Sequence, residues 1–464
     1  MTDLDSHASG ATNASDEAGA DLRRSLAAAL GTVAISDEEL AAFSAALLTR
    51  HRNALRCRSE IDQADLSFPV RPVDWYSLGY HCTDSEARPS RTLDYAAGDF
   101  FIQDAGSMLA LAACEADVPP QRDRLICDLC AAPGGKSSAL LESIGDGFLL
   151  ANEPIKSRIA PLAYNLARTG NDRYAISSLD PEVLQTRLGG VFDLVLADVP
   201  CSGQALLGRG KQSLAAVSPT QIEHSALRAR RILSSAIGLL RPGGRLVLST
   251  CTFADAENES QVRWLLEKDG VAAEPIDRLA DYASDDSGCS YRLWPHRHRC
   301  AGSFAASLRS DIGAAAAVEP ASRKKRKRRE KPERLPDELG EWFGVTPQRY
   351  QVAGAVIWAW PEDAPSWAES ISAAGPELTY RTGQTWKPSH EASLRRTGAL
   401  RGLQSVDVDD STAQQFLSGQ PIACALTGWC VVRHRGRPLG WIKASRGTGK
   451  NHLPAAARME VGVG

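Results

Sequence analysis

Residues 124–144 read RLICDLCAAPGGKSSALLESI, which combines a short apolar run, a glycine-containing loop and a helical pattern. Gly134 and Gly135 carry no β-carbon, so the backbone can come close to a ligand. The helix that follows offers unpaired N–H groups to an anion. A Walker P-loop would need a glycine at position 130, where this chain has Cys130. The stretch therefore predicts a strand–loop–helix site that is not a P-loop.

Strand-like and helical patterns alternate on either side of this stretch, between about residues 103 and 252. Short apolar runs occur at Leu125–Leu129, Phe148–Leu150, Phe192–Ala197 and Arg245–Leu248. A turn or a helical pattern follows each run, and this alternation is typical of a mostly parallel sheet covered on both faces.

Two acidic residues follow the next strand ends. Glu153 comes 18 residues after Gly135, close to the spacing of about 20 at which a carboxylate grips ribose hydroxyls in dinucleotide-binding folds. Asp180 stands where the following strand should end and could contact an adenine edge. The alternative is that Glu153 and Asp180 only cap the helices after their strands. We favour a cofactor that contains a nucleoside.

Two cysteines also lie at predicted strand ends. Cys201 follows Asp198 in FDLVLADVPCSG, and Cys251 lies near the end of GGRLVLSTCTF. Because parallel strands end at the same edge of a sheet, Asp198, Cys201 and Cys251 could share the crevice that holds the cofactor. A single buried cysteine is often only a small apolar residue, but two on neighbouring loops favour chemistry.

The remaining cysteines and histidines predict no metal site. Cys127 and Cys130 form a CxxC pair, but no second pair or histidine cluster follows at zinc spacing. Eleven cysteines, an odd number, without an N-terminal export signal predict free thiols in a reducing compartment, and hence a cytoplasmic protein. No apolar run approaches the length of a membrane span.

Composition and charge divide the rest of the chain. Residues 1–20 predict a disordered tail, and 21–48 predict two helices, the second capped by Ser36. Seven consecutive basic residues, Arg323–Arg329, mark a linker over 313–335 that could also bind phosphate. Seven of the ten tryptophans follow, in a β-rich region at 336–464, where Arg433–Lys450 holds six cations and no acid. The formal net charge of −3 therefore does not argue against RNA as a partner.

The motifs together resemble those of Sun-type RNA (cytosine-5) methyltransferases. The resemblance covers about residues 45–310 and rests on DLCAAPGGKS, LLANE, DLVLADVPCSG, RPGGRLVLSTCTF and the ENE that follows. The segments GDFFIQDAGSMLAL and RLWPHRHRCAGSF are also similar. The tail is similar to the PUA-like RNA-binding domain of bacterial 16S ribosomal RNA members. One departure is Arg56-Cys57-Arg58, where the family often has Arg-x-Asn.

This resemblance implies an α/β fold. A Rossmann-like class I methyltransferase domain would occupy 101–312, after a small α+β RNA-binding region at 21–100 and before a β-rich PUA-like domain at 336–464. The implied reaction moves a methyl group from S-adenosylmethionine to carbon 5 of cytosine. Cys251 would be the nucleophile, Asp198 would hydrogen-bond the base and lie near the methyl group, and Cys201 would assist proton removal and release of the product.

The resemblance also implies the cofactor contacts. Glu153 would hold the ribose and Asp180 the adenine. The loop that would cradle the methionine end consists of Cys130, Ala131, Ala132, Pro133, Gly134, Gly135 and Lys136.

The expected partner is RNA, in particular 16S rRNA or the small ribosomal subunit, bound by a monomer. Transfer RNA is the alternative substrate. A methyltransferase acting on an exocyclic amine would carry Asn/Asp-Pro-Pro-aromatic where this chain has Asp198-Val199-Pro200-Cys201. A non-catalytic RNA-binding protein of ribosome assembly would have no need of both cysteines.

Overall fold

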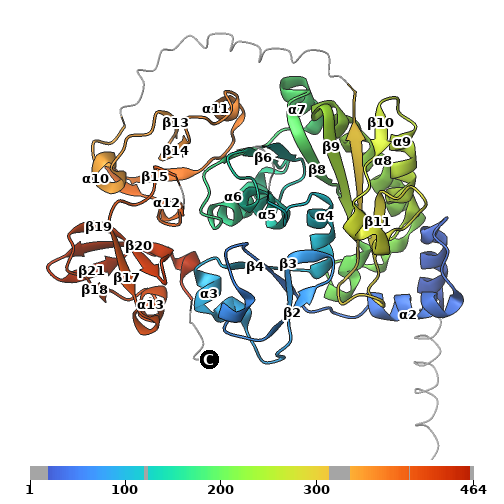
Figure 1. The fold of residues 1–464 in the computed structure, drawn as a ribbon, viewed down its shortest axis with the longest axis horizontal. Helices are drawn as coiled ribbons and strands as arrows, with labels where there is room; N and C mark the ends of the chain where they lie inside the picture. The colour runs from blue at the N-terminus through green and yellow to red at the C-terminus, as the bar shows by residue number, and fades with distance from the viewer. Residues whose placement is uncertain (1–18, 120–123, 313–334, 397, 460–464) are drawn as a thin grey trace, which may run out of the picture. The chain divides into compact units, whose positions relative to one another are not determined.

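The computed structural model describes residues 19–119, 124–312, 335–396 and 398–459 (Figure 1). The chain forms two units, each assembled from three segments. The first comprises Met1–Ala54, Asp104–Glu115 and Gly189–Ala316, and the second Leu55–Gln103, Ala116–Leu188 and Ala317–Gly464. Arg323–Arg329 and most of the predicted tail at 1–20 lie outside the described residues. The domain boundaries predicted from the sequence stay a prediction.

The first unit begins with the two predicted helices, at residues 19–30 and at α2 (Asp37–Leu47). Ser36 caps α2 as predicted, and its side chain accepts from Glu39 N while the Glu39 side chain accepts from Ser36 N. Such a capping box satisfies two N–H groups that the first turn leaves unpaired. Leu26 and Leu30 pack with Phe43 in one buried cluster.

A mixed sheet forms the core of the first unit, with strand order β10-β12-β9-β8 and β11 beside β12. The predicted runs at 192–197 and 245–248 are confirmed as strands, the second within a longer one. β8 and β9 run parallel, while β10, β11 and β12 add antiparallel pairings. The bounds are β8 (Phe192–Asp198), β9 (Leu240–Thr250), β10 (Val271–Ala273), β11 (Ser290–Leu293) and β12 (Ser303–Ser310).

Three further α-helices of this unit are α4 (Met108–Ala113), α8 (Pro219–Leu239) and α9 (Glu259–Leu266). Short 3-10 turns lie at η3 (Ala105–Ser107), η5 (Gln204–Arg209), η6 (Leu214–Val217), η7 (Asp255–Glu257) and η8 (Asp277–Tyr282). α8 starts where Ser218 accepts from Gln221 N and Pro219 fills the first helical position, a site that tolerates proline because its N–H would be unpaired anyway. In the described ranges, no helix is long and apolar enough to cross a membrane.

The second unit contains the predicted strand–loop–helix unit. β5 (Leu125–Asp128), β6 (Phe148–Asn152) and β7 (Tyr174–Ser177) form parallel neighbours in that order. Their side chains are buried almost throughout, as expected for parallel strands covered on both faces. The helices α5 (Gly135–Glu142), α6 (Ile159–Ala167) and α7 (Pro181–Leu188), with the short turn η4 (Lys156–Arg158), complete this part.

Residues 54–103 form a four-stranded sheet that the sequence did not resolve, with order β2-β3-β1-β4. Its strands are β1 (Ala54–Cys57), β2 (Val70–Val73), β3 (Tyr76–Cys82) and β4 (Phe100–Gln103), with η1 (Gln63–Asp65), η2 (Pro89–Arg91) and α3 (Leu93–Ala96) between them. Leu55, Phe68 and Phe100 share its core.

The predicted β-rich C-terminal region contains two sheets. The first has the order β13-β14-β15-β16 and the second β17-β19-β20-β21-β18. Trp342, Trp429 and Trp441 lie in one buried cluster that draws residues from both sheets, so these tryptophans are core residues.

The strands of these two sheets are β13 (Arg349–Ala353), β14 (Val356–Trp360), β15 (Glu377–Thr382), β16 (Thr385–Pro388), β17 (Ser405–Val408), β18 (Ile422–Ala423), β19 (Gly428–His434), β20 (Arg437–Ser445) and β21 (Thr448–Asn451). The helices are α10 (Leu339–Phe343), α11 (Ala368–Ile371), α12 (His390–Ser393), α13 (Asp410–Leu417) and the turn η9 (Ala455–Ala457).

Candidate active site

The two predicted cysteines meet in the first unit. In the parallel register Asp198 on β8 lies opposite Ser249 on β9, so the loops that follow start at the same sheet edge. Cys201 Sγ lies 3.4 Å from Cys251 Sγ. Neither thiol is fully buried. The structure therefore brings together the pair that the sequence singled out.

The environment of Cys201 distinguishes the two thiols. The hydrogen bond to Cys251 raises the pKa of the Cys201 thiol well above its usual value, and burial and the nearby Glu257 add to the effect. A thiol with a raised pKa keeps its proton and can donate it. The raised pKa therefore favours Cys201 as the thiol that keeps its proton, while by geometry alone either sulfur could be the donor.

Asp198 is the last residue of β8 and is only partly buried. The next residue continues the contact between the strands, since Val199 N donates to Ser249 O at 3.1 Å. The carboxylate thus stands at the strand end from which the Cys201 loop departs.

A buried carboxylate that the sequence analysis did not assign holds the Cys201 loop. Glu257 is 1% exposed and accepts from Ser202 N at 2.7 Å and from Ser202 Oγ at 2.6 Å. Ser202 Oγ also lies 2.8 Å from Thr252 Oγ1. One carboxylate therefore supports the residues that directly follow Cys201 and Cys251. Burial raises the pKa of Glu257.

Further contacts tie the two cysteine loops to each other. Ala205 N donates to Cys251 O at 3.0 Å, and Phe253 N donates to the Gln204 side chain at 2.9 Å. Asn258, which follows Glu257, donates to Thr252 O at 2.9 Å. Fixed loops of this kind keep reacting side chains in place without a conformational search.

The last residue of the ENE motif anchors the same region. Glu259 and Arg292 are each about 1% exposed in their side chains and pair at 2.6 Å. Arg292 also donates to Phe253 O at 2.9 Å. Since a buried charge is costly without a partner, this pair fixes the start of α9 beneath the Cys251 loop.

The predicted cofactor loop lies in the second unit. Gly134 adopts φ 109°, where an added Cβ would meet Asn165 Cβ at 3.1 Å and Leu162 Cδ1 at 3.2 Å. Asn165 also donates to Pro133 O at 2.7 Å. No side chain caps the start of α5, so its first N–H groups face the loop. This arrangement suits an anionic or strongly polar ligand group.

Glu153 follows β6 and is 2% exposed. Its Oε1 accepts from Ile155 N at 2.9 Å, and its Oε2 lies 3.0 Å from Arg158 Nη1. Arg158 also donates to Ala132 O at 2.6 Å. This arginine, which the sequence analysis missed, links the predicted ribose-binding carboxylate to the predicted methionine loop.

Asp180 has the contact expected of a helix cap, because its Oδ1 accepts from Glu182 N at 3.0 Å at the start of α7. The adjoining loop is held by Asn152, which is fully buried. The Asn152 side chain accepts from Leu179 N at 3.1 Å and donates to Leu179 O and Leu129 O. Asn152, also missed, joins the ends of β5, β6 and β7.

Cys127 is buried on β5, and burial raises the pKa of its thiol well above the usual value. Within the described ranges, no group of three or more potential ligands could hold a metal ion.

Arg56 and Arg58, the departure from the family pattern, both pair with Glu142. These three residues are therefore occupied by structural contacts.

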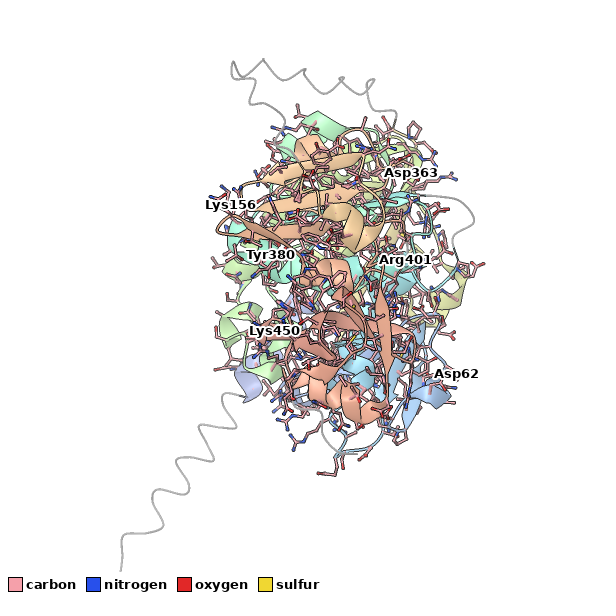
Figure 2. All side chains as sticks on the ribbon, turned by 90° about the vertical axis from the view of Figure 1, so that its left-hand side faces the viewer. Asp62, Lys156, Asp363, Tyr380, Arg401 and Lys450 are labelled. Atoms are coloured by element: carbon pink, nitrogen blue, oxygen red, sulfur yellow. The ribbon has the colours of Figure 1, made fainter. Side chains whose placement is uncertain are left out.

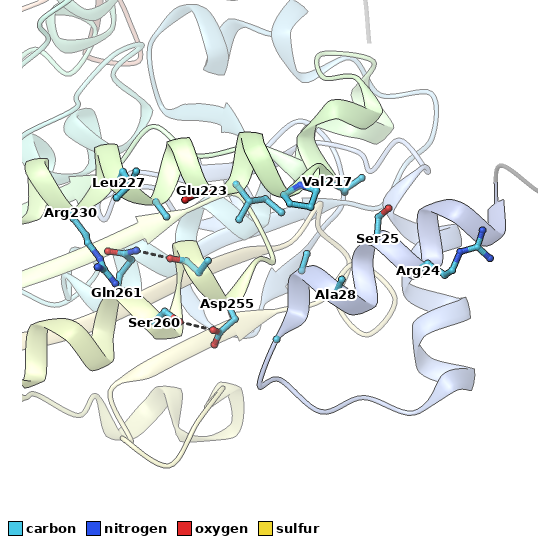
Figure 3. A pocket seen from close by; sticks show the side chains of 16 residues that line it. Arg24, Ser25, Ala28, Val217, Glu223, Leu227, Arg230, Asp255, Ser260 and Gln261 are labelled. Carbon is cyan, nitrogen blue, oxygen red and sulfur yellow. Dashed lines mark hydrogen bonds between the residues drawn. The ribbon is translucent and has the colours of Figure 1, made fainter.

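A separate apolar pocket of about 730 Å³ lies between the helix at 19–30 and α8 (Figure 3). Asp255 is one of the residues that line the pocket, and its carboxylate accepts from Ser260 Oγ at 2.6 Å and from Thr32 Oγ1 at 2.9 Å. None of the predicted site residues lines it.

Comparisons with known proteins agree with this geometry. Residues 116–309 match the sequence model of the family described as 16S rRNA methyltransferase RsmB/F, and residues 403–459 match a Methyltransferase RsmF PUA domain. Ribosomal RNA small subunit methyltransferase F of Aeromonas hydrophila is 31% identical over 84% of this chain and 86% of its own. The chain belongs to the 16S rRNA methyltransferase RsmB/F family.

The protein of the same name from Klebsiella pneumoniae is 30% identical over 84% of this chain and 85% of its own. Among solved structures, a methyltransferase homolog from Pyrococcus horikoshii has a TM-score of 0.51, with 25% identity over 59% of this chain and 91% of that one. NSun6 from Pyrococcus horikoshii has a TM-score of 0.53 with 20% identity, over 63% of this chain and 98% of that one.

Membership of the RsmB/F family makes the chain a methyltransferase with a class I fold and a C-terminal PUA domain, as the sequence predicted. The PUA match starts at residue 403. The sheet β13-β14-β15-β16 thus lies outside the matched PUA residues.

Proposed function

We propose that the protein transfers a methyl group from S-adenosylmethionine to carbon 5 of cytosine in 16S rRNA, and that it acts as a cytoplasmic monomer. The observation that carries this proposal is the pair of thiols 3.4 Å apart after two adjacent parallel strands. Methylation of an exocyclic amine would have no use for a second cysteine at this position. The names of the curated relatives support ribosomal RNA as the substrate.

The roles of the two cysteines follow from their different environments. Carbon 5 of cytosine is a weak nucleophile, and covalent catalysis can activate it. Cys251 Sγ would attack carbon 6, which places electron density on carbon 5. Cys201 would later assist removal of the carbon-5 proton and departure of Cys251. Its raised pKa, caused first by the Cys251 contact, supports the assignment of Cys251 as the nucleophile.

Asp198 would stabilise the charge that develops on the base. A carboxyl group at ring nitrogen 3 could hydrogen-bond or protonate it and so offset the negative charge created by attack at carbon 6. The position of Asp198 at the end of β8, three residues before Cys201, supports this role.

The cofactor residues fit the chemistry of S-adenosylmethionine, which supplies an electrophilic methyl group. Residues 130–136 and the uncapped start of α5 would hold the methionine carboxylate, because both offer backbone N–H groups. Glu153, kept in place by Arg158, would accept hydrogen bonds from ribose hydroxyls. Asp180 would contact the adenine.

Two cysteine variants test the reaction. Cys251→Ala should abolish transfer of labelled methyl groups to RNA, whereas Cys201→Ala should accumulate a covalent protein–RNA adduct. Activity of Cys251→Ala would remove the nucleophile assignment. Adducts that persist in Cys251→Ala and vanish in Cys201→Ala would exchange the two roles.

Bisulfite sequencing of a strain that lacks this protein tests the substrate. At least one protected cytosine of 16S rRNA should become sensitive, and the plasmid-borne chain should restore it while Cys251→Ala should not. A change confined to transfer RNA would overturn the ribosomal assignment.

A further inference from the structure

A row of one aromatic and two basic side chains crosses one face of the sheet β17-β19-β20-β21-β18. Trp429 on β19 lies opposite Lys443 on β20, and Lys443 lies opposite Lys450 on β21. Directly opposed residues of antiparallel strands project to the same face. Lys443 Nζ lies 5.8 Å from the centroid of the Trp429 ring. Both lysines are exposed.

The other C-terminal sheet contributes a third lysine. Trp441 Nε1 donates to Ser389 O at 2.7 Å, which fastens the end of β16 to β20 and brings Lys387 close to the row. Lys387 in turn lies opposite Tyr380 on β15. Figure 2 faces these C-terminal strands and labels Tyr380 and Lys450.

His452 marks the point where the three lysines converge. Its ring lies 4.4 Å from that of Trp429. Burial, together with the smaller effects of the charges on Lys450, Lys387 and Lys443, lowers the pKa of His452 to about 4. His452 is therefore neutral at physiological pH and does not add to the charge. We call Lys387, Lys443, Lys450, His452 and Trp429 the lysine patch.

The three lysines of the lysine patch take part in no ion pair within the parts of the chain that the structure describes. Like charges placed directly opposite across neighbouring strands are unfavourable. An external anion would remove that repulsion.

The three arginines in the first half of the stretch Arg433–Lys450 are engaged in contacts within the protein. Arg437 pairs with the fully buried Asp99, and Arg435 pairs with Asp410 at 3.4 Å. Arg433 donates to Gly436 O at 3.2 Å. Only the second half of the stretch Arg433–Lys450, which the sequence predicted as an RNA surface, therefore keeps lysines outside ion pairs. Lys387, which lies outside that stretch, joins them.

We propose that the lysine patch binds phosphates of the substrate RNA, outside the catalytic site. The proposal rests on the proposed function, because it takes RNA as the substrate. Several cations gathered on one face suit the phosphates of a nucleic-acid backbone, and the buried Trp429 ring keeps Lys443 in place beside them. Arg381, stacked on Trp386 at 5.3 Å, extends the basic and aromatic character along the β15–β16 hairpin. Since Lys387 precedes residue 403, the RNA site would span more than the matched PUA residues.

The test compares full-length variants by their affinity for a fluorescein-labelled 16S rRNA transcript over a salt series. The triple variant Lys387→Gln, Lys443→Gln and Lys450→Gln should bind about tenfold more weakly near 0.15 M salt. Its slope of log affinity against log salt should fall by about 2, because each lost phosphate contact removes about 0.7. The maximal methylation rate at saturating RNA should stay unchanged, with a raised KM for RNA.

Two matched variants complete the design. Replacing the three lysines by arginine should preserve affinity, since the charge is kept. Replacing Arg71, Arg187 and Arg228, which are exposed on β2, α7 and α8, by glutamine makes the same charge change and should alter the slope much less. A glutamine triple with the affinity and slope of the parent would overturn the proposal. So would a loss of binding to phosphatidylglycerol vesicles without a loss for RNA. RNA binding that depends on the patch, without cytosine methylation, would instead refute only the proposed reaction.

Discussion

At the scale of single residues, Glu257 determines how the two cysteines meet. Its carboxylate accepts both the N–H and the hydroxyl of Ser202, and Ser202 contacts Thr252 in turn. Cys201 and Cys251 each precede one of these two residues. We therefore regard Glu257 as a positioning residue that acts through the backbone of both loops.

Glu257→Ala should lower the maximal methylation rate at least tenfold and reduce the free energy of unfolding by about 1–3 kcal/mol, the cost of leaving the buried Ser202 donors unsatisfied. Steady-state kinetics and denaturant unfolding measure the two effects. The exposed Glu267→Gln serves as the control, and Glu257→Gln, which keeps an acceptor oxygen, should recover part of the rate. A stability loss with an unchanged maximal rate would reduce Glu257 to a purely structural role.

Individual residues differed in how well the sequence predicted them. Cys201, Cys251 and Asp198 could be expected to approach one another because each ends or follows a strand, and parallel strands end at one edge. Glu257, Arg158 and Asn152 could not be assigned. Their contacts depend on which loop folds over them, and spacing along the chain carries no such information. The ENE motif drew attention to Glu257, but the sequence did not show that Glu257 accepts hydrogen bonds from Ser202.

At the scale of elements, the C-terminal strands could also be predicted only in part from the sequence. The tryptophan-rich sequence predicted a β-rich region, whereas the division into two sheets depends on long-range pairing that local patterns do not specify. The partly buried carboxyls of Glu377, on β15, and Glu391, on α12, lie where these elements meet. Glu377 N donates to Glu391 Oε2 at 3.2 Å. Burial raises the pKa of Glu377 to about 7 and that of Glu391 to about 8, where the charge of Glu377 adds to the effect of burial.

These raised pKa values predict that the contribution of Glu377 and Glu391 to stability falls as pH rises from about 4.5 to about 8. Between those values the two carboxyls bind more protons in the folded state than in the unfolded state, so their contribution to the free energy of unfolding decreases with pH. Glu391→Gln, which stays neutral, should flatten the curve and be more stable than the parent above pH 8. Denaturant unfolding across this range measures it, with the exposed Glu362→Gln as control. Parallel curves for Glu391→Gln and the parent would contradict the pKa assignment.

At the scale of the whole molecule, buried ion pairs connect distant segments of the second unit. Arg56 and Arg58 pair with Glu142 on α5, and Asp99 pairs with Arg396 and Arg437 from the C-terminal region. The sequence identified Arg56-Cys57-Arg58 only as a departure from its family. Its structural role depends on Glu142, which lies far away in the sequence and which local patterns could not connect to it.

Glu142→Ala should destabilise the protein by about 3–5 kcal/mol, because it leaves two buried guanidinium groups without their carboxylate. Thermal or denaturant unfolding of the full chain measures the change. The exposed Glu86→Ala should cost less than about 0.5 kcal/mol. A Glu142→Ala variant as stable as the Glu86→Ala control would show that the network is not a stabilising link.

The net charge of −3 is also a property of the whole molecule, and it conceals where charge lies. Three lysines from two sheets lie in one patch, while the nearby Arg435 and Arg437 form ion pairs with acidic residues of the protein. Binding of RNA depends on this local placement rather than on the total.

The most direct test of the central claim is the site of covalent attachment. The full-length protein is incubated with S-adenosylmethionine and RNA that contains 5-fluorocytosine, which has no carbon-5 proton to lose, and the cross-linked peptide is mapped by mass spectrometry. The nucleotide should be attached to Cys251 in the parent and in Cys201→Ala, and no adduct should form in Cys251→Ala. Attachment to Cys201, or an adduct that survives in Cys251→Ala, would contradict the account.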